Sequence, residues 1–227
     1  MKSIEIFSFE VILCKTIKVG KSCVFIDLDN TLYNYSEANV RALHSCFKAY
    51  KSMFMAVESY SSFEEKYRLA RTKVTQRLAF QGACRSRSLA FLIMFEELGV
   101  ERAYLEAIKF EEIYWKTLIR TTKAHPGAIN FLSSCKSNGL KVCIITDMEF
   151  RWQVKKLKEF DLARFVDFIV TSEEVGHEKP HVLIFKKALE KVGLTSKDVF
   201  MVGDSLQKDI EGARSLGIDA FRVDLEE

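Results

Sequence analysis

The second half of the sequence alternates short apolar runs with longer helical patterns, and this alternation constrains the fold more than any other feature. Apolar runs at 140–146, 166–171, 198–202 and 219–223 alternate with helical patterns at 126–139, 149–160, 181–192 and 207–216. Strands that alternate with helices of this length are typical of right-handed βαβ units with parallel strands. An apolar run at 23–28 fits the same sheet. We therefore predict an α/β fold with a Rossmann-like parallel sheet as its core.

Between the first apolar run and the second, the sequence is helical in character throughout. Residues 37–122 show no strand-like alternation. In the first helical segment the apolar residues recur every three or four positions, as on one face of a helix; they are Val40, Leu43, Phe47, Tyr50, Phe54 and Val57. We therefore predict an α/β core domain formed by 1–35 and 123–227, with an all-helical domain, 36–122, inserted after the first strand.

Polar side chains gather where the predicted strands end and in the adjoining loops. They are Asp27, Asp29, Thr31, Thr146, Asp147, Lys179, Asp204 and Asp209. Ligands of open α/β sheets bind beyond the carboxyl ends of the strands, so these residues are expected to face one crevice. Two carboxylates about 4 Å apart repel by about 4 kcal/mol at an effective dielectric near 20. The cluster therefore predicts a bound Mg²⁺ ion, which with the lysine suits a transferring phosphoryl group.

Composition and charge exclude several other classes of protein. The formal net charge is only +3, from 34 basic and 31 acidic residues, which does not indicate a nucleic-acid partner. Charged residues interrupt the apolar residues of the first 20 positions, so we predict neither a signal peptide nor a membrane helix there. We expect this leader to add strands before the core. The six cysteines include no CxxC pair, which favours reduced thiols and a cytoplasmic protein.

Four motifs in this order resemble those of the haloacid dehalogenase-like (HAD) hydrolase superfamily. They are Asp27-Leu-Asp-Asn-Thr-Leu-Tyr, Thr146, Gly176-His-Glu-Lys179-Pro and Gly203-Asp-Ser-Leu-Gln-Lys-Asp209. The likeness extends over 23–223, and the inserted helical block is similar to the subclass I cap. The resemblance implies an enzyme whose cap closes over the site, excludes water and selects the leaving group.

The resemblance also implies a role for the carboxylates. Asp27 is the expected nucleophile, forming an aspartyl-phosphate that water later hydrolyses. Asp29 is expected to protonate the leaving alcohol and then activate that water, with its carboxyl group off the metal. The ligands expected for Mg²⁺ are the Asp27 side chain, the Asp29 backbone carbonyl and Asp204. Asp209 is expected to contribute directly or through water.

The other matching residues are expected to bind the phosphate or to order the loops. Thr146 is expected to donate a hydrogen bond to the phosphate, Lys179 to pair with Asp27 and the phosphoryl oxygens, and Thr31 to order its loop. Asp147 stands where these enzymes commonly have asparagine. Either its carboxylate lies near the substrate and disfavours a dianion, or it caps the helix that follows; we favour the cap.

Two arginines in a polar break between cap helices are the candidates for specificity. Either Arg85 or Arg87 contacts a second anionic group on the substrate, or both are solvated loop residues; we favour the solvated loop.

The function expected from the resemblance is hydrolysis of a small phosphorylated metabolite, such as a sugar phosphate or a nucleoside monophosphate. A phosphomutase would use the same aspartyl-phosphate and differs in the fate of the phosphoryl group. The resemblance implies that a haloacid dehalogenase needs neither Mg²⁺ nor an acid at position 29, so Asp29 and Asp204 argue against it. A non-catalytic binding module would be supported by loss of a catalytic carboxylate, and none is lost.

Overall fold

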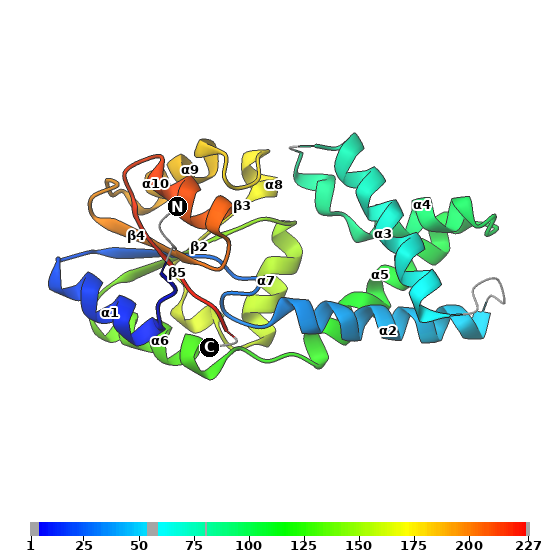
Figure 1. Cartoon of the computed structure of the whole chain (residues 1–227), viewed down its shortest axis with the longest axis horizontal. Helices are drawn as coiled ribbons and strands as arrows, with labels where there is room; N and C mark the ends of the chain where they lie inside the picture. Colours follow the sequence, from blue (N-terminus) through cyan, green and yellow to red (C-terminus); the bar gives the residue numbers. More distant parts are fainter. Residues whose placement is uncertain (1–4, 54–58, 80, 226–227) are drawn as a thin grey trace. The chain divides into compact units, whose positions relative to one another are not determined.

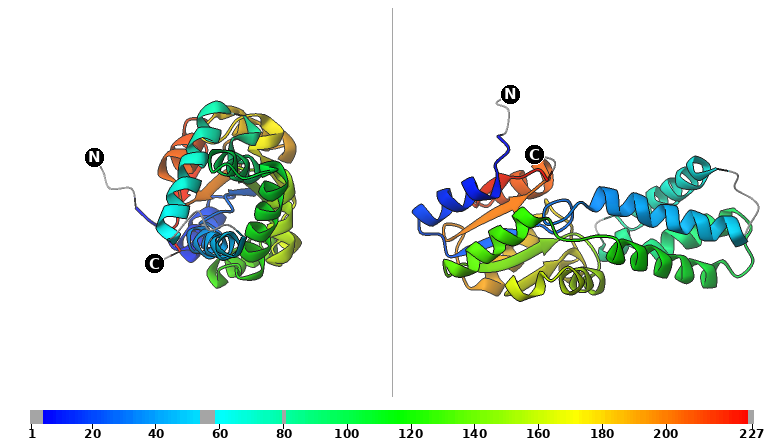
Figure 2. Two further views of the ribbon diagram at one scale, coloured as in Figure 1. Left: turned by 90° about the vertical axis from the view of Figure 1, so that its right-hand side faces the viewer. Right: turned by 90° about the horizontal axis from the view of Figure 1, so that it is seen from below.

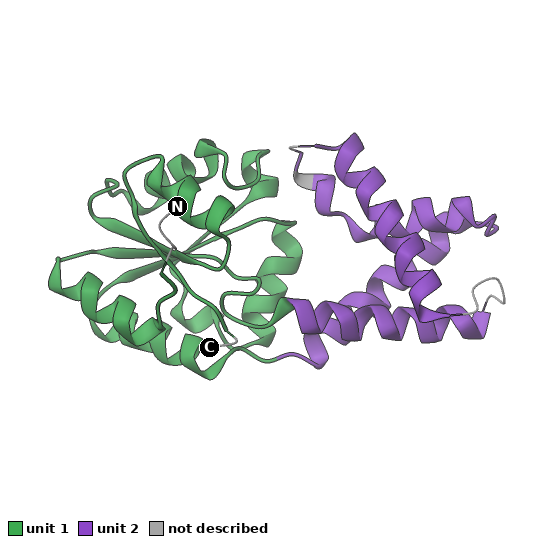
Figure 3. Ribbon diagram, viewed as in Figure 1, with its two compact units in different colours: residues 1–35, 123–227 green, residues 36–122 purple. Residues whose placement is uncertain are grey.

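The computed structural model describes residues 5–53, 59–79 and 81–225. The chain divides into two compact units, residues 1–35 with 123–227, and residues 36–122 (Figure 3). The first is an α/β unit, and the described residues of the second form helices and no strand.

The α/β unit is built on a five-stranded sheet, formed by β1 (Cys23–Ile26), β2 (Lys141–Thr146), β3 (Phe168–Thr171), β4 (Val199–Gly203) and β5 (Asp219–Arg222). All its neighbouring strands pair in parallel, in the order β3-β2-β1-β4-β5. This confirms the predicted parallel α/β fold. The chain steps outward from β1 to β3 and then crosses back to place β4 on the other side of β1. The strand order therefore reverses between β1 and β4, where open α/β sheets bind their ligands.

Helices cover both faces of this sheet. They are α1 (Phe9–Lys18), α6 (Pro126–Ser137), α7 (Phe150–Glu159), α8 (Ser172–Val175), α9 (Val182–Val192) and α10 (Gly212–Arg214), with a short 3₁₀ helix, η2 (Ala163–Phe165), and a π-helical segment, η3 (Leu206–Glu211). Helices α1 and α6 lie side by side on one face, and α9 and α10 lie on the other (Figures 1 and 2). Strand β1 is buried along its whole length, which explains its uninterrupted apolar sequence.

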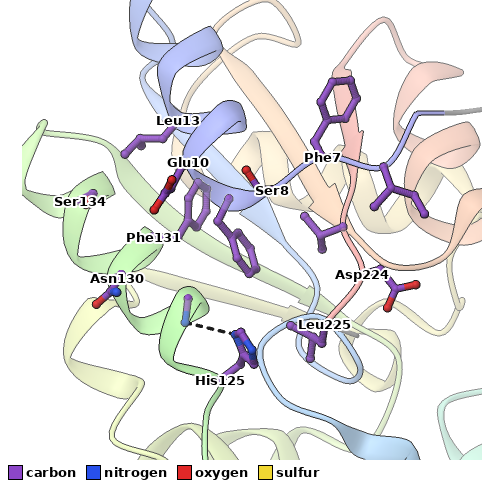
Figure 4. Close-up of a pocket in the computed structure, with 14 residues that line it drawn as sticks. Phe7, Ser8, Glu10, Leu13, His125, Asn130, Phe131, Ser134, Asp224 and Leu225 are labelled. Carbon is purple, nitrogen blue, oxygen red and sulfur yellow. Dashed lines mark hydrogen bonds between the residues drawn. The ribbon is translucent and has the colours of Figure 1, made fainter. Parts of the chain in front are cut away.

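The leader forms a helix rather than the strands that its apolar residues suggest. Ser8 caps α1 by accepting a hydrogen bond from the Val11 N–H at 3.4 Å. Before the helix, Ile6 forms a single bridge with Arg222 of β5. A pocket of about 480 Å³ lies between α1, α6 and the segment after β5 (Figure 4). Its lining includes Phe9, Phe131 and His125. It contains none of the candidate site residues that the sequence predicts at the ends of the strands.

The helical unit comprises α2 (Tyr35–Met53), α3 (Tyr60–Arg77), η1 (Gly82–Arg85), α4 (Arg87–Glu97) and α5 (Ala103–Arg120). Aromatic side chains fill its interior; for example, the rings of Phe95 and Phe110 meet edge to face with centroids 4.8 Å apart. Leu43 and Tyr50 of the predicted apolar face are buried, but Val40 is 44% exposed. Phe54 and Val57 lie outside the described residues. Within the described ranges, no helix is both long enough and apolar enough to cross a bilayer.

Candidate active site

Three carboxylates meet beyond the point where the strand order reverses. Asp27 follows β1, Asp204 follows β4, and Asp209 lies in η3 about one turn later. Each offers an oxygen atom within 4.8 Å of the others. Asp27 and Asp209 are buried, with 6% and 1% of their surface exposed. The sheet thus brings together acids from distant parts of the sequence.

A buried lysine lies directly against this cluster. The Nζ atom of Lys179 lies 2.5 Å from Oδ1 of Asp27 and 2.7 Å from Oδ1 of Asp209. It also donates a hydrogen bond to the backbone carbonyl of Ile145 at 3.0 Å. Three acceptors therefore surround the ammonium group, as a buried charge requires.

Burial and the neighbouring charges shift the pKa values of the clustered carboxyl groups and of Lys179. Burial raises the pKa of Asp27 well above its usual range; Lys179 opposes the rise, and Asp209 and Asp204 add to it. Burial and the charge of Asp209 also raise the pKa of Asp204. Burial lowers the pKa of Lys179, but Asp209 and Asp27 outweigh it and hold the pKa above its ordinary value. The ammonium therefore stays charged, and it faces a cluster of three carboxyl groups. Closely spaced carboxylate oxygens are suitable ligands for Mg²⁺, so the residues present fit that ion.

Thr31 connects the loop after β1 with the loop after β4. Its Oγ1 accepts a hydrogen bond from the Asp204 N–H at 3.1 Å and lies 3.4 Å from Oδ2 of Asp27. The side chain is completely buried. These contacts agree with a residue that orders the loop rather than one that contacts substrate.

Asp29 is not a member of the cluster of three carboxylates, and its carboxyl group contacts other side chains. Its Oδ1 accepts hydrogen bonds from the Tyr33 hydroxyl at 2.5 Å and from Lys156 Nζ at 2.7 Å. Its Oδ2 accepts a longer one, at 3.3 Å, from Nε2 of Gln153. The sequence analysis did not identify these three partners. Gln153 and Lys156 belong to α7 and are both fully buried.

Thr146 ends β2 and is likewise fully buried. Its Oγ1 accepts a hydrogen bond of 2.6 Å from the same amide of Gln153. One side chain of α7 thus contacts both Thr146 and Asp29.

The helix-capping interpretation of Asp147 is wrong. The N-cap of α7 is Glu149, which makes no side-chain capping bond. The Oδ1 of Asp147 instead accepts from the backbone N–H of Lys179 at 2.9 Å, and its Oδ2 pairs with Lys208 Nζ at 2.7 Å. Asp147 therefore fixes the loop that carries Lys179, and a cation balances its charge.

The two arginines of the helical unit differ in their surroundings. Arg87 opens α4 and is buried, with its guanidinium 4.0 Å from the ring centre of Tyr114 and 2.5 Å from the Tyr67 hydroxyl. The favoured interpretation, a solvated loop residue, is therefore wrong for Arg87. Arg85 ends η1 and is half-buried, and it stays a candidate for contacting substrate.

Comparison with known proteins places this geometry in a family. A sequence model of the haloacid dehalogenase-like hydrolases matches residues 21–217. Ribulose-1,5-bisphosphate 5-phosphatase of Halopiger xanaduensis is 29% identical over 204 residues, covering 89% of this chain and 84% of its own. Glyceraldehyde 3-phosphate phosphatase of Methanocaldococcus jannaschii is 31% identical over 204 residues, covering 88% and 83%.

The fold is also found in solved structures. The magnesium-bound HAD-hydrolase YfnB from Bacillus subtilis superposes with a TM-score of 0.67 at 22% identity, over 88% of this chain and 87% of its own. Fold and sequence agree: the chain belongs to the haloacid dehalogenase-like hydrolase family.

Proposed function

We propose that the protein is a Mg²⁺-dependent phosphohydrolase that cleaves a small phosphorylated metabolite through an aspartyl-phosphate on Asp27. One observation carries the proposal: Asp27, Asp204 and Asp209 converge within 4.8 Å, with Lys179 in contact with two of them. The two curated relatives named above are phosphatases of small phosphorylated sugars, which supports a substrate of that size.

In the first half of the reaction, a carboxylate oxygen of Asp27 attacks the phosphorus atom. The bond between phosphorus and the ester oxygen breaks, and the carboxyl proton of Asp29 passes to the leaving oxygen. Lys179 stabilises the negative charge of the phosphoryl oxygens. Thr146 donates its hydroxyl hydrogen to one of them.

In the second half, water attacks the phosphorus atom and gives its proton to the Asp29 carboxylate. The bond between phosphorus and Asp27 breaks, which regenerates the nucleophile and releases inorganic phosphate. The ion would be held by the Asp27 side chain, the Asp29 backbone carbonyl and Asp204, and when bound it neutralises the charge that gathers on the phosphoryl group. Asp209 supports this set indirectly, since its two oxygens contact Lys179 and the Ser205 N–H.

The test is phosphate release from a panel of sugar phosphates, nucleotides and a nitrophenyl phosphate, with and without Mg²⁺. We expect Asp27→Asn and Asp29→Asn each to abolish release from the metabolites while the protein stays folded. Asp161→Asn is the matched control, because Asp161 is exposed and has a φ of 57°, which asparagine also tolerates. Wild-type turnover that persists in excess chelator contradicts the proposal. An isomerised product without free phosphate would indicate a phosphomutase.

A further inference from the structure

The carboxyl group of Asp29 is held by three side chains for which the reaction above has no role. Lys156 Nζ and the Tyr33 hydroxyl contact one oxygen at 2.7 and 2.5 Å, and Gln153 Nε2 contacts the other at 3.3 Å. Donors thus surround both oxygens from two directions, the loop after β1 and helix α7. The direction in which this carboxyl group points is therefore fixed by its neighbours.

Lys156 is the unusual member of this set, because its side chain has no exposed surface. Its ammonium lies 5.6 and 5.4 Å from the ring centres of Tyr33 and Tyr35 and 3.8 Å from the sulfur of Met148. Aromatic faces and a thioether are weaker partners for a cation than the carboxylate of Asp29, which lies 2.7 Å from the ammonium. A lysine is rarely buried unless it is paired, which ties the position of Lys156 to that of Asp29.

The carboxyl group of Asp29 is also not a member of the cluster formed by the other three carboxylates. The oxygens that converge within 4.8 Å belong to Asp27, Asp204 and Asp209, although Asp29 is only two residues from Asp27. A free carboxyl group beside a divalent ion is a suitable ligand for that ion. A carboxylate that binds the ion is not available to exchange a proton with the substrate. The contacts of the Asp29 carboxyl group with Gln153 and Lys156 hold it against α7.

We propose that Lys156, assisted by Tyr33 and Gln153, is a positioning residue that keeps the Asp29 carboxyl group off the metal and available for proton transfer. This inference rests on the proposed function, in which Asp29 carries the proton. Gln153 extends the arrangement, since the same amide donates to Thr146 at 2.6 Å. The proton carrier and the phosphate-binding hydroxyl are thereby held in a fixed relation.

The experiment compares two esters that differ in their need for a proton. The leaving group of an alkyl phosphate must be protonated, whereas dinitrophenolate leaves without a proton. For Lys156→Met we expect kcat/KM on the alkyl phosphate to fall on the order of 100-fold, the usual contribution of general acid catalysis, and that on dinitrophenyl phosphate to fall less than about tenfold. We also expect a burst of dinitrophenolate, because Asp29 no longer activates water in the second half.

The controls distinguish positioning from a general loss of structure. Lys158→Met removes an exposed lysine of the same helix and should match the wild type on both esters. Asp29→Asn should show a selective loss in the same direction as Lys156→Met and a larger one, because the amide cannot carry the proton. Tyr33→Phe removes a single hydroxyl and should show a smaller loss in the same direction, and it decides the question if Lys156→Met does not fold.

The possible failures are distinguishable. If the wild type releases no phosphate from any ester, the proposed function fails. Suppose instead that the wild type is active and Asp29→Asn is selective. If Lys156→Met or Tyr33→Phe then lowers kcat/KM equally on both esters, or on neither ester, this inference alone is overturned.

Discussion

Gly203→Ala tests how closely the carboxylate cluster is packed against the end of β4. An added Cβ atom would lie 2.4 Å from both Cγ and Oδ2 of Asp209 and 2.6 Å from its Cβ, whereas ordinary contacts are 3.4–4 Å. The Asp209 side chain must therefore move by about 1 Å, the difference between these distances and the normal packing separation. It is 1% exposed, so there is little room for that movement.

The movement would break contacts that define the site. Asp209 pairs with Lys179 at 2.7 Å and accepts from the Ser205 N–H at 3.0 Å, and a shift of this size takes both beyond hydrogen-bonding distance. Overpacking costs about 1–3 kcal/mol. Disrupting a buried ion pair costs about 3–5 kcal/mol. Lys179 keeps its pairing with Asp27, and alanine lowers the entropy of the unfolded chain, so we expect a net loss of about 3–5 kcal/mol.

The assay is equilibrium unfolding in urea in the presence of chelator, followed by circular dichroism. Gly139→Ala is the matched control: an added Cβ atom there meets nothing within 4 Å, but the φ of +75° is unfavourable for alanine. It should cost about 1–2 kcal/mol from backbone strain alone. If Gly203→Ala is no less stable than Gly139→Ala, Asp209 can leave its position freely, and the reasoning about a closely packed cluster is refuted.

Substitutions of Lys179 and Lys208 test the charge interactions of the site. Lys179→Met should lower the free energy of unfolding in chelator by about 3–5 kcal/mol, because it leaves buried carboxylates uncompensated. Burial already raises the pKa of Asp27, and removing Lys179 removes the contribution that opposes the rise. Protonation of Asp27 then stabilises the folded variant at low pH, and this stabilisation is lost as the pH rises through the raised folded-state pKa. Urea midpoints should therefore fall as the pH rises above the ordinary range of carboxyl groups, and a flat profile would contradict this. Lys208→Met should lower the free energy of unfolding by about 1 kcal/mol, because it removes the ion pair with Asp147. In a double-mutant cycle, the loss of the double variant with Asp147→Asn should be smaller than the sum of the two single losses. Additive losses would show that the two side chains are independent.

The sheet was predictable from the sequence because each of its strands has a strong local pattern. β1 and β4 are continuous apolar runs, and both are buried along their whole length. The acids that follow them had to meet, since parallel strands end at one edge. The predicted strand at 166–171 is shorter in the structure, because β3 begins only at Phe168. A short helix, Ala163–Phe165, lies just before the predicted start.

The leader was harder, because its apolar residues suit a strand or a helix when they are considered alone. The helical signals lie in its polar residues: Ser8 in capping position, Glu10 in the first turn, and Lys15 and Lys18 in the last. Such an arrangement is the usual one for a helix, because the charges complement its dipole.

The partners of Asp29 could not be found from motifs at the strand ends, because they lie on a helix. Lys156 and Leu157 lie three and four positions after Gln153, so the three residues share one face of α7, and all three are buried. An amide and an ammonium on the buried face of a helix need polar partners across the interface. The position of α7 after β2, whose carboxyl end it follows, places those partners among the residues at the sheet edge. A lysine among the apolar positions of a helix that follows a strand with a polar end therefore predicts an acidic partner at that edge of the sheet.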